Sequence, residues 1–235
     1  MMVKVAQTMD LFNDQLKREQ HICNLLQKHF QQVSPQQILY ELKRYGLDVN
    51  SEQIPYHTSW WASLLEWAST LQHKWNGPST TIYLLPAQNL NAVCFQKCIC
   101  LFVKAPVTNN ILRALLTHEY NHSCRLARFG LPETVEDYIV LEGLAQWAVR
   151  ELHGEEALQT WTTRLSYEEA LEIWTEVDLD SIVDVYSILF GEEAAFIPSH
   201  FGYTFGYRLI EQYVKRNDCT ISELLDLPTD VFLPK

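Results

Sequence analysis

The sequence predicts an α+β fold that is mostly helical, with a small β-sheet beside one long helix and with helical parts at the N- and C-termini. Two observations carry this prediction. Eight glycines and nine prolines in 235 residues are too few for a turn-rich all-β fold. Apolar residues recur at helical spacing through most of the chain, and only residues 77–104 change to short β-like runs. With 47% hydrophobic residues, the chain has enough apolar side chains for a packed core.

The first third of the chain, residues 1–76, is predicted to be a helical subdomain. A serine followed by proline is a typical helix start, because serine caps the helix and proline is tolerated at its first position. The turn-forming residues Asn76-Gly77-Pro78 stop the last helix of this part. The predicted helices are residues 4–31, a short helix that starts at Ser34-Pro35 and closes at Gly46, and an apolar helix from Thr58 to about Trp75.

Residues 77–104 are predicted to form the sheet. Short runs rich in β-branched, aromatic and other apolar residues are separated there by polar residues. We expect Cys98 and Cys100 to be buried as small hydrophobic side chains. The spacing of the six cysteines fits neither a disulfide framework nor a Cys-x-x-Cys zinc knuckle. The two or three predicted strands are residues 81–85, 93–95 and 98–103.

A helix over residues 110–128, closed by Gly130, is predicted to follow the sheet. Apolar residues and two histidines alternate along one line of this helix, so both histidines are expected on its buried face. Neutral imidazoles that are buried together need polar partners, and one metal ion satisfies both. The alternative is a pair of core histidines bonded to the backbone. The residues of this line are Ile111, Leu115, His118, His122 and Leu126.

The next helix is predicted to start at Thr134, where Asp137 completes a capping box, and to end near Leu152. Glu142 lies in its apolar stripe, where a carboxylate is costly to bury unless it is paired or bound to a metal. Gly143 costs about 1 kcal/mol relative to alanine in a helix, which indicates close packing against another element. Because short connections make antiparallel neighbours, we expect Glu142 to fold back toward the two histidines.

The remainder of the chain is predicted to be helical again. Together with the sheet, these helices form the second part of the chain, residues 77–235, either as a separate domain or continuous with the first part. Serine and threonine caps paired with a glutamate three residues later mark two of the helix starts. The predicted helices run from Ser166 to about Glu176, over residues 180–190 and 203–215, and from Thr220 onward, with a loop at residues 191–198.

The segment His118-Glu119-Tyr120-Asn121-His122 is the strongest indication of chemistry. On a helix, His118 and His122 lie one turn apart on one face, so both imidazoles reach a single metal ion. Glu119 then lies beside the metal, where it accepts a proton from a bound water. Two histidines and one glutamate leave a fourth position open, which is the catalytic arrangement of zinc. We therefore expect one zinc ion per chain, held by His118, His122 and Glu142.

The separation between His122 and Glu142 is similar to that in the glutamate-zincin peptidases, whose third ligand is a glutamate on the next helix. More closely, the chain resembles the YjaZ-like family of predicted zinc-dependent proteases over most of its length after the N-terminal helices. The resemblance rests on residues 97–104, on residues 115–122, on Glu142-Gly143-Leu144-Ala145 and on residues 203–207. It implies a zincin-like active-site helix, a zinc-dependent peptidase activity and a peptide or protein substrate.

In the mechanism that this reading gives, Glu119 is the general base and a further side chain stabilises the oxyanion. Tyr203 is the favoured donor, and Tyr207 and His200 are the other candidates. The strand at residues 98–103 is expected to offer an edge to an extended peptide. Gln146 occupies a position where some related peptidases carry an acidic residue that orients a zinc histidine, so the histidine is expected to be less basic here.

Two other function classes remain. A non-catalytic regulatory or peptide-binding protein would retain the metallopeptidase scaffold, although an intact Glu119 is not needed by such a protein. A cysteine hydrolase would pair one of the thiols with His200 or His57, and nothing in the sequence around any cysteine favours it.

Charge and the N-terminus restrict the partners and the compartment. The net charge of −11 disfavours nucleic acid and gives no support for an anionic membrane surface. Residues 1–10 do not have the pattern of a signal peptide, and no apolar run is long enough for a transmembrane helix. We expect a soluble cytoplasmic protein, and the sequence leaves its oligomeric state open.

Overall fold

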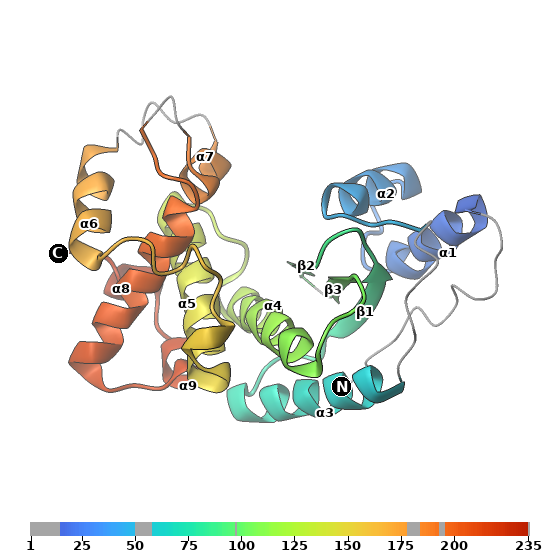
Figure 1. The fold of residues 1–235 in the computed structure, drawn as a ribbon, viewed down its shortest axis with the longest axis horizontal. Coiled ribbons are helices and arrows are strands. Elements are labelled where there is room, and N and C mark those ends of the chain that lie inside the picture. Colours follow the sequence, from blue (N-terminus) through green and yellow to red (C-terminus); the bar gives the residue numbers. More distant parts are fainter. Residues whose placement is uncertain (1–14, 50–57, 97, 178–183, 193–195, 235) are drawn as a thin grey trace. The chain divides into compact units, whose positions relative to one another are not determined.

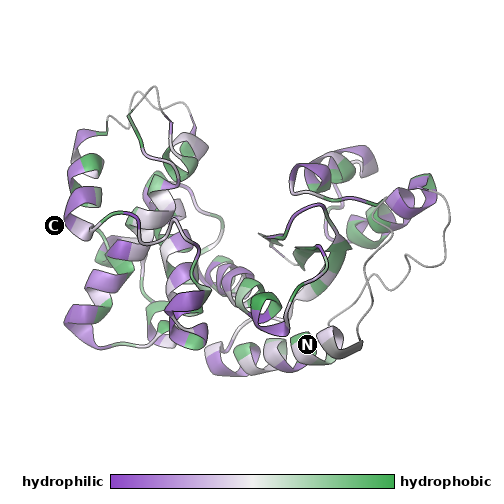
Figure 2. Ribbon diagram, in the orientation of Figure 1, coloured by the Kyte–Doolittle hydropathy of each residue, from purple (hydrophilic) through white to green (hydrophobic). Residues whose placement is uncertain are grey.

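The computed structural model describes residues 15–49, 58–96, 98–177, 184–192 and 196–234. By its internal packing the chain divides into two compact units, residues 1–123 and 124–235. The architecture is α+β and mostly helical, as predicted, with one small sheet (Figure 1). The helices carry hydrophobic and hydrophilic residues side by side along the ribbon, as amphipathic helices do (Figure 2). The division into residues 1–76 and 77–235 stays a prediction.

The first unit begins with α1 (Gln15–Gln27), α2 (Pro35–Arg44) and α3 (Thr58–Trp75). The capped start at Ser34 and both ends of α3 agree with the sequence. The first helix is shorter than predicted at its C-terminal end. The Gln27 amide group donates to the carbonyls of Phe30 and Val33 at 3.0 and 2.8 Å, and these bonds hold the chain in a turn. Residues 4–14 of that predicted helix lie outside the described part of the chain.

The sheet contains β1 (Thr81–Pro86), β2 (Asn91–Phe95) and β3 (Cys98–Val103) in the order β1-β3-β2. β3 pairs in parallel with β1 and antiparallel with β2, so it is the central strand. The prediction that residues 98–103 offer a free edge to a peptide is therefore wrong. All six residues of β3 are buried, whereas β2 is the exposed to half-buried strand at one side of the sheet.

One face of the sheet packs against α1 and α2. Cys98 and Cys100 are fully buried in this core, as predicted, together with Tyr83 and Phe102. The Tyr83 hydroxyl lies 3.0 Å from Nε2 of His29, so the turn that follows α1 is also tied to β1 by a polar contact.

The long helix α4 (Asn109–Phe129) begins in the first unit and ends in the second, because the division falls between Ser123 and Cys124. Within the first unit it is fixed by buried polar contacts as well as by packing. The Tyr120 hydroxyl donates to the carbonyl of Pro78 at 2.8 Å, and the hydroxyls of Thr80 and Ser123 are 2.8 Å apart.

The second unit is built around α5 and α8, and the predicted capping boxes at Thr134, Ser166 and Thr220 are all present. The prediction of a helix over residues 203–215 is confirmed, with two more residues at each end. The helix predicted at residues 180–190 is described only from Val185, because residues 178–183 lie outside the described ranges. The helices are α5 (Val135–His153), α6 (Tyr167–Glu176), α7 (Val185–Phe190), α8 (Phe201–Asn217) and α9 (Ile221–Leu224), with short 3₁₀ helices at Glu155–Ala157 and Thr229–Val231.

The prediction that Gly143 packs closely against another element is confirmed. A Cβ atom on Gly143 would lie 2.3 Å from the carbonyl carbon of Gly206, so α5 and α8 touch backbone to backbone. Among the described residues, none of the helices is both long enough and apolar enough to cross a membrane.

Candidate metal centre

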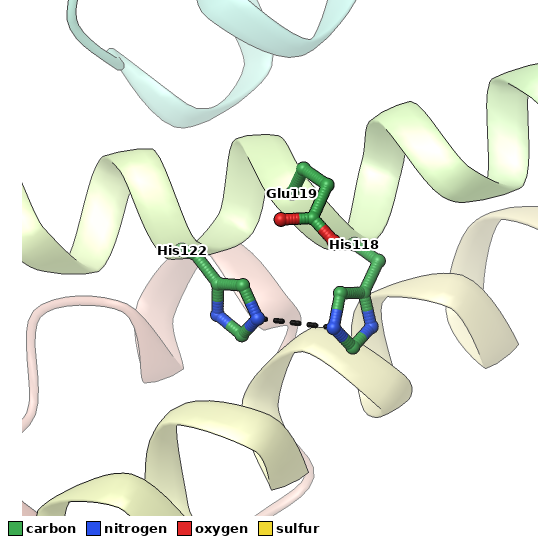
Figure 3. A group of neighbouring side chains, drawn as sticks. All are labelled: His118, Glu119 and His122. Atoms are coloured by element: carbon green, nitrogen blue, oxygen red, sulfur yellow. Dashed lines mark hydrogen bonds between the residues drawn. The ribbon is translucent and has the colours of Figure 1, made fainter. Parts of the chain in front are cut away.

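His118, Glu119 and His122 form a group on α4 that is suited to a metal ion. Their ligand atoms all lie within 4.8 Å of one another. The Nε2 atoms of the two histidines are 3.0 Å apart, and both rings project from the same side of the helix (Figure 3). The ring planes are nearly perpendicular, at 86°.

This arrangement fits a zinc ion. Two imidazole nitrogens bound at about 2.0 to 2.1 Å to one tetrahedral ion are roughly 3.3 Å apart. The observed separation of 3.0 Å needs only a small change of side-chain torsion to reach that value. Glu119 is 6% exposed and His122 7% exposed, whereas His118 is half-buried, so the group is only partly open to solvent.

The buried line of α4 differs from the predicted one. Ile111 is 43% exposed and His118 is half-buried, whereas Leu112, Leu116 and Tyr120 are fully buried. The helix therefore packs through a neighbouring line of residues, with His118 at the border of the buried face, whereas His122 is itself buried. Because His118 is only half-buried, the alternative of two core histidines is less favoured than the sequence alone suggested.

A contact that sequence reasoning missed holds α4 in place one residue before His118. The Trp67 indole N–H of α3 donates to the Thr117 hydroxyl at 2.8 Å, and this hydroxyl donates to the carbonyl of Arg113, also at 2.8 Å. The Arg113 side chain in turn donates to Ser63 at 2.9 Å. Trp67 was predicted only as part of an apolar stripe, and no local pattern in the sequence indicates its polar partner.

Glu142, the predicted third ligand, is a half-buried residue of α5 in the second unit. Its place in the ligand set stays a prediction, because the histidines belong to the first unit. Gln146 lies one turn further along α5 and is 4% exposed. Its side-chain oxygen accepts a long hydrogen bond from the buried Thr162 hydroxyl, at 3.4 Å.

The three candidate oxyanion donors differ in their surroundings. Tyr207 is 1% exposed and packs against Trp147, and burial raises its pKa to about 12. Tyr203 is half-buried, with its ring 4.8 Å from that of Trp161. His200 stacks on the same Trp161 ring at 5.2 Å, and burial together with the positive charge of Arg164 lowers its pKa. The role of Trp161 has no local signal in the sequence.

The cysteines are poorly suited to nucleophilic catalysis. All six are free thiols, and Cys98, Cys100 and Cys124 are fully buried. Burial raises the pKa of Cys100 well above its ordinary value, and the neighbouring Cys98 raises it further. Burial also raises the pKa of Cys23 and of Cys219. Because the thiolate is the nucleophile, these shifts oppose the cysteine-hydrolase alternative.

A helix-borne His-Glu-His group in a mostly helical α+β fold defines a candidate metalloprotein, and its donor types suit zinc. Comparison with known families points to the same metal. The chain belongs to the family described as "Predicted Zn-dependent protease (DUF2268)", whose model matches residues 60–234.

Two proteins of Bacillus subtilis (strain 168) are similar to the chain. "Uncharacterized protein YjaZ" is 29% identical over 184 residues, which is 69% of this chain and 69% of that protein. "Uncharacterized protein YjfC" is 31% identical over 125 residues, which is 47% of this chain and 42% of that protein. The sequence-based resemblance to the YjaZ-like family is confirmed.

Proposed function

We propose that the protein is a zinc-dependent peptidase, with one zinc ion held by His118, His122 and Glu142. The observation that carries the proposal is the pair of Nε2 atoms 3.0 Å apart, with a Glu119 carboxylate oxygen in the same group. Two histidines with one glutamate, here Glu142, are the donors that catalytic zinc sites use, and they leave one position open beside Glu119. Membership of a family described as predicted zinc-dependent proteases supports the same metal.

A bound zinc ion supplies Lewis-acid polarisation of a water molecule and of the substrate carbonyl. Glu119 acts as the general base, since its carboxylate lies beside the two imidazoles and is almost fully shielded from solvent. It takes one proton from the attacking water and later gives it to the leaving amine. The C–N bond breaks, and the products are a carboxylic acid and an amine.

Tyr203 is the proposed donor to the oxyanion. Its side chain is half-buried, whereas the Tyr207 side chain is almost fully buried beside Arg208 and Glu211, in a polar depression on the second unit. A phenol with its proton in place donates one hydrogen bond to the developing negative charge, which is the contribution that such a donor makes.

We propose that an extended peptide substrate binds along the edge strand β2. It is antiparallel to β3 and lies at one side of the sheet, while β3 is paired on both sides. A peptide that pairs with the outer edge of β2 would be held through its main chain, so sequence selectivity has to come from side-chain contacts elsewhere.

Zinc content and hydrolysis of a casein-derived peptide mixture, each measured on wild type, Glu119→Gln and His122→Ala, test the proposal. We expect about one zinc per chain in wild type and in Glu119→Gln, and little in His122→Ala. Hydrolysis should occur with wild type alone. If the wild type binds zinc but hydrolyses no peptide, the non-catalytic scaffold is favoured. If the wild type contains no zinc after expression in zinc-supplemented medium, the metal site is overturned.

A further inference from the structure

The outer side of α7 carries aromatic rings that the core of the second unit does not bury. Ile188 and Leu189 of this short helix are buried in the core, whereas Tyr186 and Phe190 are 54% and 48% exposed. The two exposed rings lie one helical turn apart and stack on each other with centroids 6.2 Å apart. α7 is therefore apolar on two sides, and the described residues of the core cover one of them.

Phe190 is joined to a wider cluster of rings at the start of α8, which lies beside α7 (Figure 1). Its ring centroid is 5.5 Å from that of Tyr203 and 6.1 Å from that of His200. Trp161 stacks on His200 with an angle of 6° between the planes. We call five side chains the aromatic ledge: Trp161, Tyr186, Phe190, His200 and Tyr203.

Three described residues of the connection between α7 and α8 have a positive φ. Gly191 has a φ of 86°, and a Cβ atom there would lie 2.2 Å from the carbonyl oxygen of Pro198. His200 has a φ of 61°, and its N–H donates to the carbonyl of Phe190 at 2.8 Å. Phe196 has a φ of 58° and is 91% exposed. The bond from His200 to Phe190 brings the two ends of this connection together, so their rings share one surface.

We propose that the aromatic ledge binds an apolar side chain of the polypeptide substrate and so determines specificity. This inference rests on the proposed function. Tyr203 is part of the aromatic ledge and is also the proposed oxyanion donor. A peptide with its scissile carbonyl at Tyr203 therefore carries a neighbouring side chain across Phe190 and Trp161. Aromatic faces bind aliphatic and aromatic side chains by dispersion and by offset or edge contacts.

Charge distinguishes this occupant from two others. The chain carries a net charge of −11, which repels a second copy of itself and an anionic lipid surface. The exposed acids Asp184 and Glu192 lie two residues before Tyr186 and two residues after Phe190. These acids disfavour an acidic occupant beside α7, while Arg164 places a positive charge near His200 at the other end of the ledge. A peptide segment with an uncharged apolar side chain therefore suits the exposed rings.

The test compares the zinc-loaded wild type with Phe190→Ala and Tyr186→Ala. The probes are fluorescent peptides of Gly, Ser, Ala and Lys with a single central Phe or a single central Ser. Tyr40→Ala is the matched control, because Tyr40 is an aromatic residue of α2 that is 65% exposed. We expect the ratio of kcat/KM for the Phe peptide to that for the Ser peptide to fall about tenfold in both ledge variants, with unchanged zinc content. The control should keep the wild-type ratio.

Binding of the same peptides to Glu119→Gln, with and without Phe190→Ala, separates the inference from the peptidase proposal. If wild type hydrolyses no peptide but Phe190→Ala still weakens binding of the Phe peptide, the ledge stands and the peptidase proposal fails. Hydrolysis or binding that is equal for both peptides overturns the ledge. Self-association of wild type that Phe190→Ala abolishes also overturns it, in favour of a second copy as the occupant.

Discussion

Gly143 of α5 and Gly206 of α8 pack so closely that neither position has room for a Cβ atom. A Cβ atom on Gly143 would lie 2.3 Å from the Gly206 carbonyl carbon, and one on Gly206 would lie 2.1 Å from the carbonyl oxygen of Ile139. Both obstacles are backbone atoms and cannot move aside alone. The crossing fixes the spacing between the helix that carries Glu142 and the helix that carries Tyr203.

Gly206→Ala is expected to destabilise the protein by about 1 to 3 kcal/mol, because the two helices must move apart. The change also improves helix propensity by about 1 kcal/mol, which the clash has to exceed. Urea unfolding followed by circular dichroism measures the effect. Ala127→Gly, on the exposed side of α4, gives the propensity contribution alone. A Gly206→Ala protein as stable as wild type would contradict the close crossing.

Loss of Glu142 is expected to lower zinc affinity by more than the roughly 10- to 100-fold that removal of a ligand-orienting partner costs. Competition with a zinc-binding dye compares Glu142→Ala with wild type. The control is Glu136→Ala, since Glu136 is a carboxylate near the N-terminal end of the same helix. Equal affinity in both variants would remove Glu142 from the ligand set and would leave the two histidines with another third ligand.

Thr117→Val is expected to cost about 1 to 2 kcal/mol, because the Trp67 indole N–H loses its acceptor while the side-chain volume is kept. Thr70→Val on α3 is the control. The Thr70 hydroxyl also bonds to a main-chain carbonyl, but Thr70 is exposed, so the loss of stability should stay within about 0.5 kcal/mol. Thermal unfolding of both variants measures the difference. Similar costs at both sites would show that the Trp67 contact does not fix α4.

Glu211 is expected to make the second unit sensitive to acid. It pairs with Arg208, Arg150 and Lys215 at 2.8, 3.1 and 3.3 Å. Although burial raises the pKa of Glu211, the hydrogen bonds and charges of Arg208 and Lys215 outweigh it, and the pKa lies below its ordinary value of 4.5. A carboxyl group with a lower pKa in the folded state stabilises the protein above its unfolded-state pKa. That stabilisation is lost as the pH falls through the folded-state value.

Glu211→Gln should therefore lower stability at neutral pH by about 2 kcal/mol and reduce the dependence of stability on pH between roughly pH 5 and 3. Urea unfolding over that range measures both effects. Glu41→Gln, which breaks an exposed pair with Arg44, should change stability by less than about 0.5 kcal/mol. A pH dependence equal to that of wild type would show that Glu211 carries no such linkage.

Local signals predicted the parts of the fold that local interactions determine. The caps at Ser34, Thr134 and Ser166 are made by side chains three residues from their partners, and the structure contains all three. The same holds for His118 and His122, whose spacing along one helix is enough to bring their rings together.

The features that sequence reasoning missed depend on distant residues. The central position of β3 follows from pairing with β1 and β2, which the composition of a single strand does not encode. The buried line of α4 follows from the elements that pack on it. The end of α1 is an exception, because the contacts of Gln27 are local and were still missed. Trp161 meets His200 and Tyr203 from a segment far away in sequence.

α4 also restricts how the length of this chain can vary in evolution. Within the first unit, Arg113 of this helix donates to Ser63 of α3, and one turn later Thr117 accepts from Trp67 of the same α3. One inserted residue between Arg113 and Thr117 turns the rest of the helix by about 100°, so one of these two contacts must break. Homologous chains should therefore gain or lose residues in the connections between elements and keep the number of residues from Arg113 to Thr117 constant.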